Sequence, residues 1–152
     1  MNVDLSQLEV APVVHAIQLS VAPVFLLSGV GVFLGVLTNR LARIVDRARP
    51  LEDRLHEARA HEADTLRERL KALSQRAHCI HLAITLATIA ALLVAVVVAL
   101  LFASAFVSFN LSAPVAILFI GSMLTLVGAL VAFLIEVQIA IRTVRILYER
   151  KS

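Results

Sequence analysis

The sequence predicts an all-α integral membrane protein with three transmembrane helices and a cytoplasmic helical hairpin between the first and the second. Hydrophobic residues make up 60% of the 152 residues, and only 16% are charged. A water-soluble domain of this size would lack the polar surface to cover such a composition. The apolar residues form three blocks, 17–37, 80–106 and 115–135. Each block can cross about 30 Å of hydrocarbon as a helix.

The positions of the basic residues orient the predicted helices. Ten of the 14 Lys and Arg residues lie between the first two apolar blocks, and the other four follow the third block. Short loops rich in Lys and Arg stay in the cytoplasm, so we expect the N-terminus outside and the C-terminus inside. The predicted segments are an extracytoplasmic segment 1–16, transmembrane helix 17–39, cytoplasmic hairpin 40–79, transmembrane helix 80–106, extracytoplasmic loop 107–113, transmembrane helix 114–137 and cytoplasmic helix end 138–152.

The sequence also argues against a cleavable signal peptide, an intramolecular disulfide and a nucleic-acid partner. No basic residue precedes Arg40, so the first block does not resemble a cleavable signal peptide. The single cysteine, Cys79, allows no intramolecular disulfide. The pI near 9.8 is typical of many nucleic-acid-binding proteins, but the basic residues are confined to one predicted side of a membrane. We therefore expect no nucleic-acid partner.

The first predicted span carries a stripe of polar and small residues with heptad spacing. If several copies assembled around an axis with this helix innermost, the stripe would line a narrow pore with polar rings, an apolar constriction and a basic inner vestibule. Alternatively, these residues make hydrogen bonds between helices, and the arginines anchor the span at lipid phosphates. Pro23 predicts a hinge within the span. The candidate pore-lining residues are Gln18, Phe25, Ser28, Val32, Gly35, Asn39, Arg40, Arg43 and Arg47.

The hairpin is predicted from apolar residues that keep helical spacing among charged ones on both sides of a turn. Pro50 should kink the outgoing helix or start a new one. The apolar spacing fades at residues 61–63, and Thr65 with Glu68 is typical of a capping box that starts the returning helix. The charged face is either simply solvated or a docking surface for a protein or an anionic lipid.

Small residues at intervals of four predict close helix packing in all three spans. The first span has a GxxxG pair, the second a ridge of six alanines, and the third a small-xxx-small pair. The ridge turns about 40° per step, so no single neighbour should contact all of it. These faces could pack within one chain or between chains, and we favour a homo-oligomer. The residues are Gly31, Gly35, Ala83, Ala87, Ala91, Ala95, Ala99, Ala103, Gly128 and Ala132.

Two groups of titratable residues are candidates for chemistry. Glu136 lies alone at the inner end of the third span, where a carboxylate needs a partner, and Arg40 or Arg43 at the same depth could form an interhelix ion pair with it. A gating or ion-sensing role and simple snorkelling are the alternatives. His78 and His81 share a helix face and form a weak candidate metal site, with an interfacial pair as the alternative. No familiar catalytic or cofactor motif is present, so we expect neither an enzyme nor a cofactor.

The runs APVFLL, residues 22–27, and TNRLARIVDRAR, residues 38–49, carry a family resemblance. The sequence resembles a bacterial membrane-protein family catalogued as domain of unknown function 2721, and the likeness continues through the second span to Glu136. It implies a multi-pass protein of the bacterial inner (plasma) membrane and no particular activity. Pro50 departs from the helix former expected at that position.

From these patterns we expect a homo-oligomeric inner-membrane protein that forms an ion channel with the first helix lining the pore. Its partners would be the lipid bilayer, its own copies and inorganic ions. The alternative is a non-conducting scaffold or regulatory protein whose basic hairpin docks a protein or anionic lipid.

Overall fold

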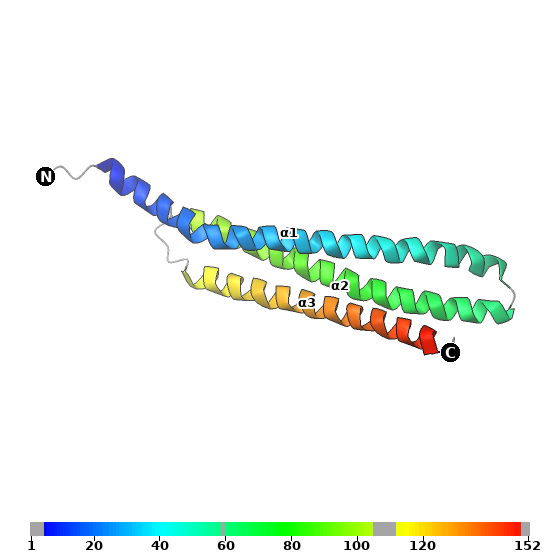
Figure 1. Ribbon diagram of the computed structural model, residues 1–152. Helices are drawn as coiled ribbons and strands as arrows, with labels where there is room; N and C mark the ends of the chain where they lie inside the picture. Colours follow the sequence, from blue (N-terminus) through cyan, green and yellow to red (C-terminus); the bar gives the residue numbers. More distant parts are fainter. Residues whose placement is uncertain (1–4, 59, 105–111, 150–152) are drawn as a thin grey trace. The chain divides into compact units, whose positions relative to one another are not determined.

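The computed structural model describes residues 5–58, 60–104 and 112–149, with side chains described for 13–55, 58, 62–104 and 112–141. This part of the chain consists of three α-helices, α1 (Leu5–Glu57), α2 (Ala60–Ser104) and α3 (Ser112–Glu149) (Figure 1). Residues 107–111 of the predicted extracytoplasmic loop lie outside the described residues. So do the side chains of Arg142, Arg145, Arg150 and Lys151, which contribute to the predicted orientation.

All three helices are long and apolar enough to span a membrane. Their most apolar stretches bury fewer than a quarter of their residues inside the chain, so large apolar side chains such as Phe25, Leu92 and Leu124 lie on the outside. The 53 residues of α1 and the 45 of α2 correspond to about 80 Å and about 70 Å of helix. Both lengths exceed the thickness of a bilayer's hydrocarbon core, about 30 Å.

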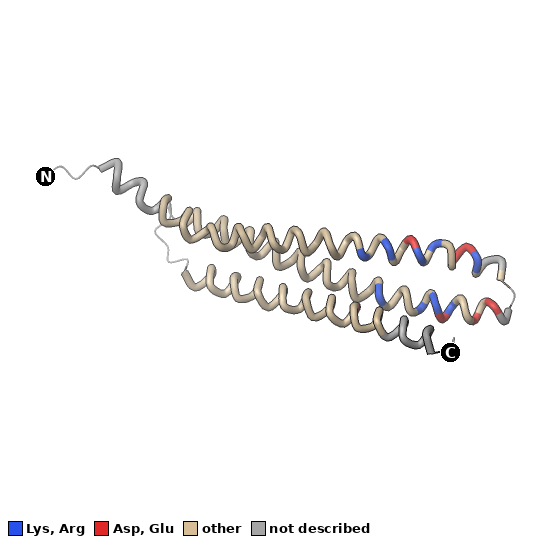
Figure 2. Tube along the Cα trace, viewed as in Figure 1, with Lys and Arg blue, Asp and Glu red and all other residues tan. Residues whose placement is uncertain are grey.

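The charged residues of α1 and α2 gather in the stretches that flank the connection between these two helices (Figure 2). Apart from Glu9 near the start of α1, the remaining described parts of α1 and α2 are free of Lys, Arg, Asp and Glu. The sequence therefore changes from apolar to charged within one continuous helix, without a break at the change.

The chain forms two compact units, and each contains segments of all three helices. Unit 1 comprises Met1–Phe33 and Ala87–Leu126. Its described core is built from small and β-branched side chains, which permit close approach of helices. Two serines are buried there, and each hydroxyl donates to a carbonyl of its own helix, Ser20 to Ala16 and Ser122 to Phe119, both at 2.7 Å. The buried apolar residues are Ala16, Val30, Ala87, Ala90, Val94, Val97.

Unit 2 comprises Leu34–Leu86 and Val127–Ser152. Its buried apolar residues again come from each helix, and a single carboxylate, Glu136, is buried with them. On α1 the buried positions are seven residues apart, which keeps them on one side of the helix. The apolar members are Leu37, Ile44, Ala63, Leu66, Ile80, Ala83, Ala129 and Ala132.

One of the two outcomes predicted at Pro50 is excluded, and the helix start predicted at Thr65 is wrong. Pro50 starts no new helix, because α1 continues to Glu57. The ring removes one backbone donor, but Pro50 and Asp46 are both exposed, so water can replace the lost bond at the Asp46 carbonyl. Thr65 does not cap a helix, because α2 already begins at Ala60 and Thr65 lies within its second turn.

The alanine ridge of α2 turns as its spacing predicts. Ala83 and Ala87 are fully buried, Ala91 is half-buried, and Ala95, Ala99 and Ala103 are exposed. Beyond Ala87 the buried positions are Ala90, Val94 and Val97. Positions spaced alternately by three and four residues stay on one side of a helix with 3.6 residues per turn. Positions spaced by four every time, like the alanines, gradually turn away from the core.

Candidate functional site

Glu136 is the centre of an ion-pair cluster in unit 2. Its Oε1 accepts two hydrogen bonds from Arg76, from Nε at 3.1 Å and Nη2 at 2.8 Å. Its Oε2 accepts one from Nη1 of Arg40 at 3.0 Å. The Arg40 guanidinium also lies over the ring of Phe133, 4.9 Å from the centroid. These contacts connect α1, α2 and α3 through one carboxylate, and we call Arg40, Arg76 and Glu136 the Glu136 cluster.

Burial differs sharply within the Glu136 cluster. The side chain of Glu136 is 1% exposed, that of Arg76 18% and that of Arg40 40%. A carboxylate removed from water needs hydrogen bonds and an opposite charge, and the two guanidinium groups supply both. Among the described residues, every buried side-chain nitrogen and oxygen has a hydrogen-bond partner.

The local sequence places the two arginines at similar distances from the ends of their apolar blocks. Arg40 follows the buried Leu37 by three residues, and Arg76 precedes the buried Ile80 by four, so each lies about one helical turn into the charged segment. The sequence predicts either Arg40 or Arg43 as the partner of Glu136. In the structure the partner is Arg40, whereas Arg43 is exposed and forms no ion pair with Glu136. Sequence reasoning missed Arg76, although its distance from the second apolar block resembles that of Arg40 from the first.

The remaining stripe residues of α1 are exposed. In unit 1 these are Gln18, Phe25, Ser28 and Val32, and in unit 2 Gly35, Asn39, Arg43 and Arg47. Phe25 and Val32 are 75% and 72% exposed. The Ser28 hydroxyl donates to the Val24 carbonyl at 3.2 Å. Arg40 differs from the rest of the stripe because it is half-buried and turned toward Glu136.

The described glycines fall into two classes. A Cβ built on Gly29, Gly31 or Gly35 of α1 would meet nothing within 4 Å. On α3, a Cβ at Gly128 would lie 3.3 Å from Cδ1 of Leu86, and one at Gly121 would lie 3.9 Å from Cδ1 of Leu93. Gly128 of the small pair of α3 therefore packs against α2 within the chain, and Ala132 is buried, whereas a Cβ at the glycines of α1 would contact nothing.

The histidine pair has little support as a metal site. His78 and His81 are both exposed, and no group of three or more potential His, Cys, Asp or Glu ligands occurs among the described residues. Cys79 between them is half-buried and free.

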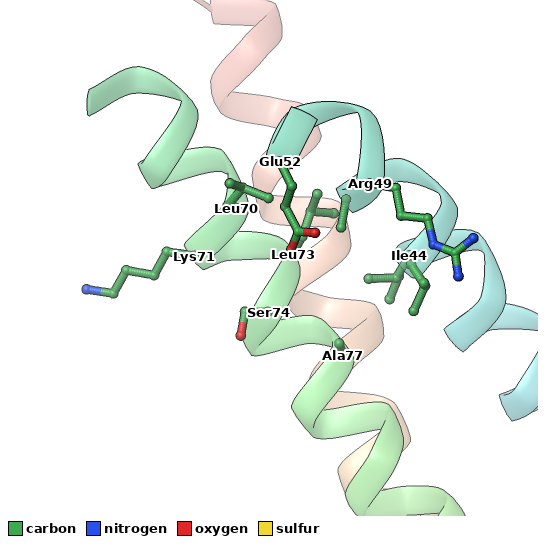
Figure 3. A pocket seen from close by; sticks show the side chains of 10 residues that line it. Ile44, Arg49, Glu52, Leu70, Lys71, Leu73, Ser74 and Ala77 are labelled. Carbon is green, nitrogen blue, oxygen red and sulfur yellow. The ribbon is translucent and has the colours of Figure 1, made fainter. Parts of the chain in front are cut away.

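A groove of about 500 Å³ lies between α1 and α2 in unit 2 (Figure 3). Apolar side chains from both helices form most of it, and in Figure 3 Arg49 and Lys71 extend away from each other on its two sides. It combines an apolar floor with a charged rim. The lining residues are Ile44, Val45, Ala48, Arg49, Glu52, Leu70, Lys71, Leu73, Ser74 and Ala77.

Together, the apolar helices and the buried ion-pair cluster define a class of protein, a three-helix protein with helices suited to span a membrane. The family model described as "Protein of unknown function (DUF2721)" matches residues 20–146. This match covers most of the chain, including every residue of the Glu136 cluster, so the chain belongs to that family, as the sequence runs predict. No curated protein and no solved structure shows a significant match.

Proposed function

We propose that the chain is a homo-oligomeric protein of the bacterial inner membrane in which α1 faces the neighbouring subunits and lines an ion pathway. The observation that carries this proposal is the exposed face of α1, which holds glycines without neighbours together with polar side chains. The N-terminus would lie outside and the charged ends of α1 and α2 in the cytoplasm.

The glycines support a contact between subunits. A glycine inside a helix destabilises it by roughly 0.5–1 kcal/mol relative to alanine, and Gly29, Gly31 and Gly35 gain no close packing within the chain in return. In lipid, small residues let two helix backbones approach closely. The exposed sides of both α1 and α3 also present large residues such as Phe25 and Leu124, but only on α1 do they accompany glycines whose Cβ positions would be open.

The polar residues support a water-filled path. Gln18 and Asn39 are exposed, and neither makes a side-chain hydrogen bond to another described residue. These amides lie at the two ends of the first apolar block, and in a ring of subunits they could bond to their copies or to water. Arg43 and Arg47 would form the basic inner vestibule. Arg40 does not belong in the pore-lining set, because its guanidinium is engaged by Glu136.

Disulfide crosslinking tests the subunit contact. In a Cys79→Ser background, Ser28→Cys on α1 should form crosslinked dimers in membranes under mild oxidation. Leu124→Cys on α3, which is also exposed in unit 1, is the matched control and should remain monomeric. Equal crosslinking of both variants, or none of Ser28→Cys together with a monomeric mass in lipid nanodiscs, would contradict the proposal.

Ion flux into liposomes tests conduction. Purified protein should raise the permeability of the liposomes above that of empty ones, and Asn39→Leu should lower it at equal protein content. Leu124→Ala, which changes an exposed residue of α3, should leave the flux unchanged. An oligomer that crosslinks through Ser28→Cys but conducts nothing would disprove the channel and leave the oligomer standing.

The groove between α1 and α2 favours a second candidate function, a scaffold that docks a cytoplasmic protein. Its apolar floor and charged rim match the two faces of an amphipathic helix. A photo-reactive residue at Ser74 would then capture one defined protein in cells, and Val45→Glu would abolish this product. The same residue at Asp53, outside the groove lining, is the control.

A further inference from the structure

The Glu136 cluster is unbalanced in charge. Two guanidinium groups, each carrying one positive charge, share the single carboxylate of Glu136. The carboxylate uses both of its oxygens for them, so its charge is already shared. One positive charge therefore remains without compensation inside the cluster.

The uncompensated charge is accessible at Arg40. A guanidinium has five N–H donors, and Arg40 uses one of them, at Nη1, for a hydrogen bond to another described residue. Its side chain is 40% exposed, whereas that of Arg76 is 18% exposed. The Arg40 guanidinium lies over the ring of Phe133, with 4.9 Å between Cζ and the ring centroid, and this contact restrains its orientation. A planar, oriented guanidinium edge suits two oxygens of a phosphate group.

We propose that Arg40 and the Glu136 cluster bind the headgroup phosphate of an anionic phospholipid of the cytoplasmic leaflet. This inference rests on the proposed insertion of the three helices in the membrane and on their proposed orientation. It requires neither the oligomer nor conduction.

The position of Arg40 favours a lipid over a soluble phosphate. Arg40 lies three residues, or about 4.5 Å along the helix, beyond Leu37 at the end of the first apolar block. Phosphates of the cytoplasmic leaflet lie at this boundary between hydrocarbon and water. The net positive charge favours an anionic lipid, because the headgroup of a zwitterionic lipid carries its own cation.

Arg43 provides a matched control for the experiment. It is the next basic residue along α1, and it carries the same charge one helical turn further from the apolar block. It is exposed and makes no ion pair with another described residue. General attraction between a basic surface and an anionic membrane would depend equally on both arginines, whereas a built site depends on Arg40.

The experiment measures retention of lipid by the purified full chain in detergent, using native mass spectrometry. Wild-type protein should retain phosphatidylglycerol in preference to phosphatidylcholine, with one saturable lipid per chain. Arg40→Gln should weaken this binding about tenfold, because charge-assisted hydrogen bonds are lost, and Arg43→Gln should change it less than about twofold. Arg40→Lys keeps the charge but lacks the planar donor pair, so it should bind with intermediate affinity.

Several outcomes would overturn the inference. Equal weakening by Arg40→Gln and Arg43→Gln would show general charge attraction, and equal retention of phosphatidylcholine would remove the role of net charge. Displacement of the lipid by millimolar inorganic phosphate would identify a site for a soluble anion. If Arg40→Gln fails to fold, wild-type affinity of the folded Arg40→Lys variant would exclude bidentate recognition, and a loss would support it. Extraction of membranes that contain the same variants tests insertion separately. A failure of insertion can therefore be distinguished from loss of the lipid site alone.

Discussion

Glu136 is stabilised by two arginines that contribute unequally. Arg76 donates two hydrogen bonds to Oε1 and is the more buried partner, while Arg40 donates one to Oε2 and is also held by Phe133. Because breaking a buried ion pair leaves an uncompensated charge behind, the stability of the fold should respond differently to the removal of each member.

We expect the order of destabilisation to be Glu136→Gln, then Arg76→Gln, then Arg40→Gln. Glu136→Gln leaves two arginines without a counter-ion and should cost about 3–5 kcal/mol. Arg43→Gln, at an exposed position, should cost less than about 0.5 kcal/mol. Unfolding of the purified protein in mixed detergent micelles measures these differences. A loss for Arg43→Gln as large as that for Arg76→Gln would contradict the role assigned to the cluster.

The Glu136 cluster also shows how far sequence reasoning reaches at single residues. A carboxylate at the end of an apolar block demands a cation at the same depth, and this indicates Arg40 or Arg43. Depth alone does not distinguish Arg40 from Arg43, because the choice depends on which side of α1 meets α3. Arg76 satisfies the same depth condition from α2, but its direction around the helix is also set by packing.

At the scale of the helix, the two classes of glycine should respond differently to the same substitution. Gly128→Leu adds a side chain where a Cβ already lies 3.3 Å from Leu86, so it should overpack the chain and cost about 1–3 kcal/mol. Gly31→Leu adds the same atoms to open space, so it should raise the stability of the monomer by roughly 0.5–1 kcal/mol while weakening the oligomer. Unfolding in detergent and mass in nanodiscs measure the two effects. Loss of monomer stability in Gly31→Leu would contradict this division.

Pro50 and Pro114 offer a second comparison within helices. Pro50 interrupts the interior of α1, so Pro50→Ala should restore a backbone hydrogen bond and stabilise the helix by up to about 3 kcal/mol. Pro114 lies in the first turn of α3, where its missing N–H has no helical acceptor, so Pro114→Ala should change stability little. Melting temperatures of both variants test this prediction. An equal change in melting temperature would contradict the expected dependence on the position of the proline in the helix.

The lengths of the helices were harder to predict than their existence. Continuous apolar blocks of about 20 residues require membrane-length helices, and all three occur. The ends of the charged segments depend on weaker local signals, and the capping pattern at Thr65 lies inside α2 because continued helix satisfies the same backbone groups. The drift of the alanine ridge was predictable, because it follows from helix geometry alone.

At the scale of the molecule, the separation of charged and apolar segments determines how the chain would sit in a bilayer. The charged ends of α1 and α2 carry nine of the 14 basic residues, and helices of about 80 Å and about 70 Å cannot be contained in the hydrocarbon. We therefore propose that these ends lie in water on the side that retains basic loops.

Cysteine labelling in intact cells tests this orientation. In a Cys79→Ser background, Ala113→Cys at the start of α3 should react with a membrane-impermeant maleimide, because it lies on the predicted outer side. Glu52→Cys, in the charged stretch of α1, should react only after the membrane is permeabilised. Both positions are exposed in the structure, so burial in the chain does not explain a difference between them. Labelling of Glu52→Cys in intact cells with Ala113→Cys protected would reverse the orientation. It would also move Arg40 to the outer leaflet, where the anionic lipid site would have to be reconsidered.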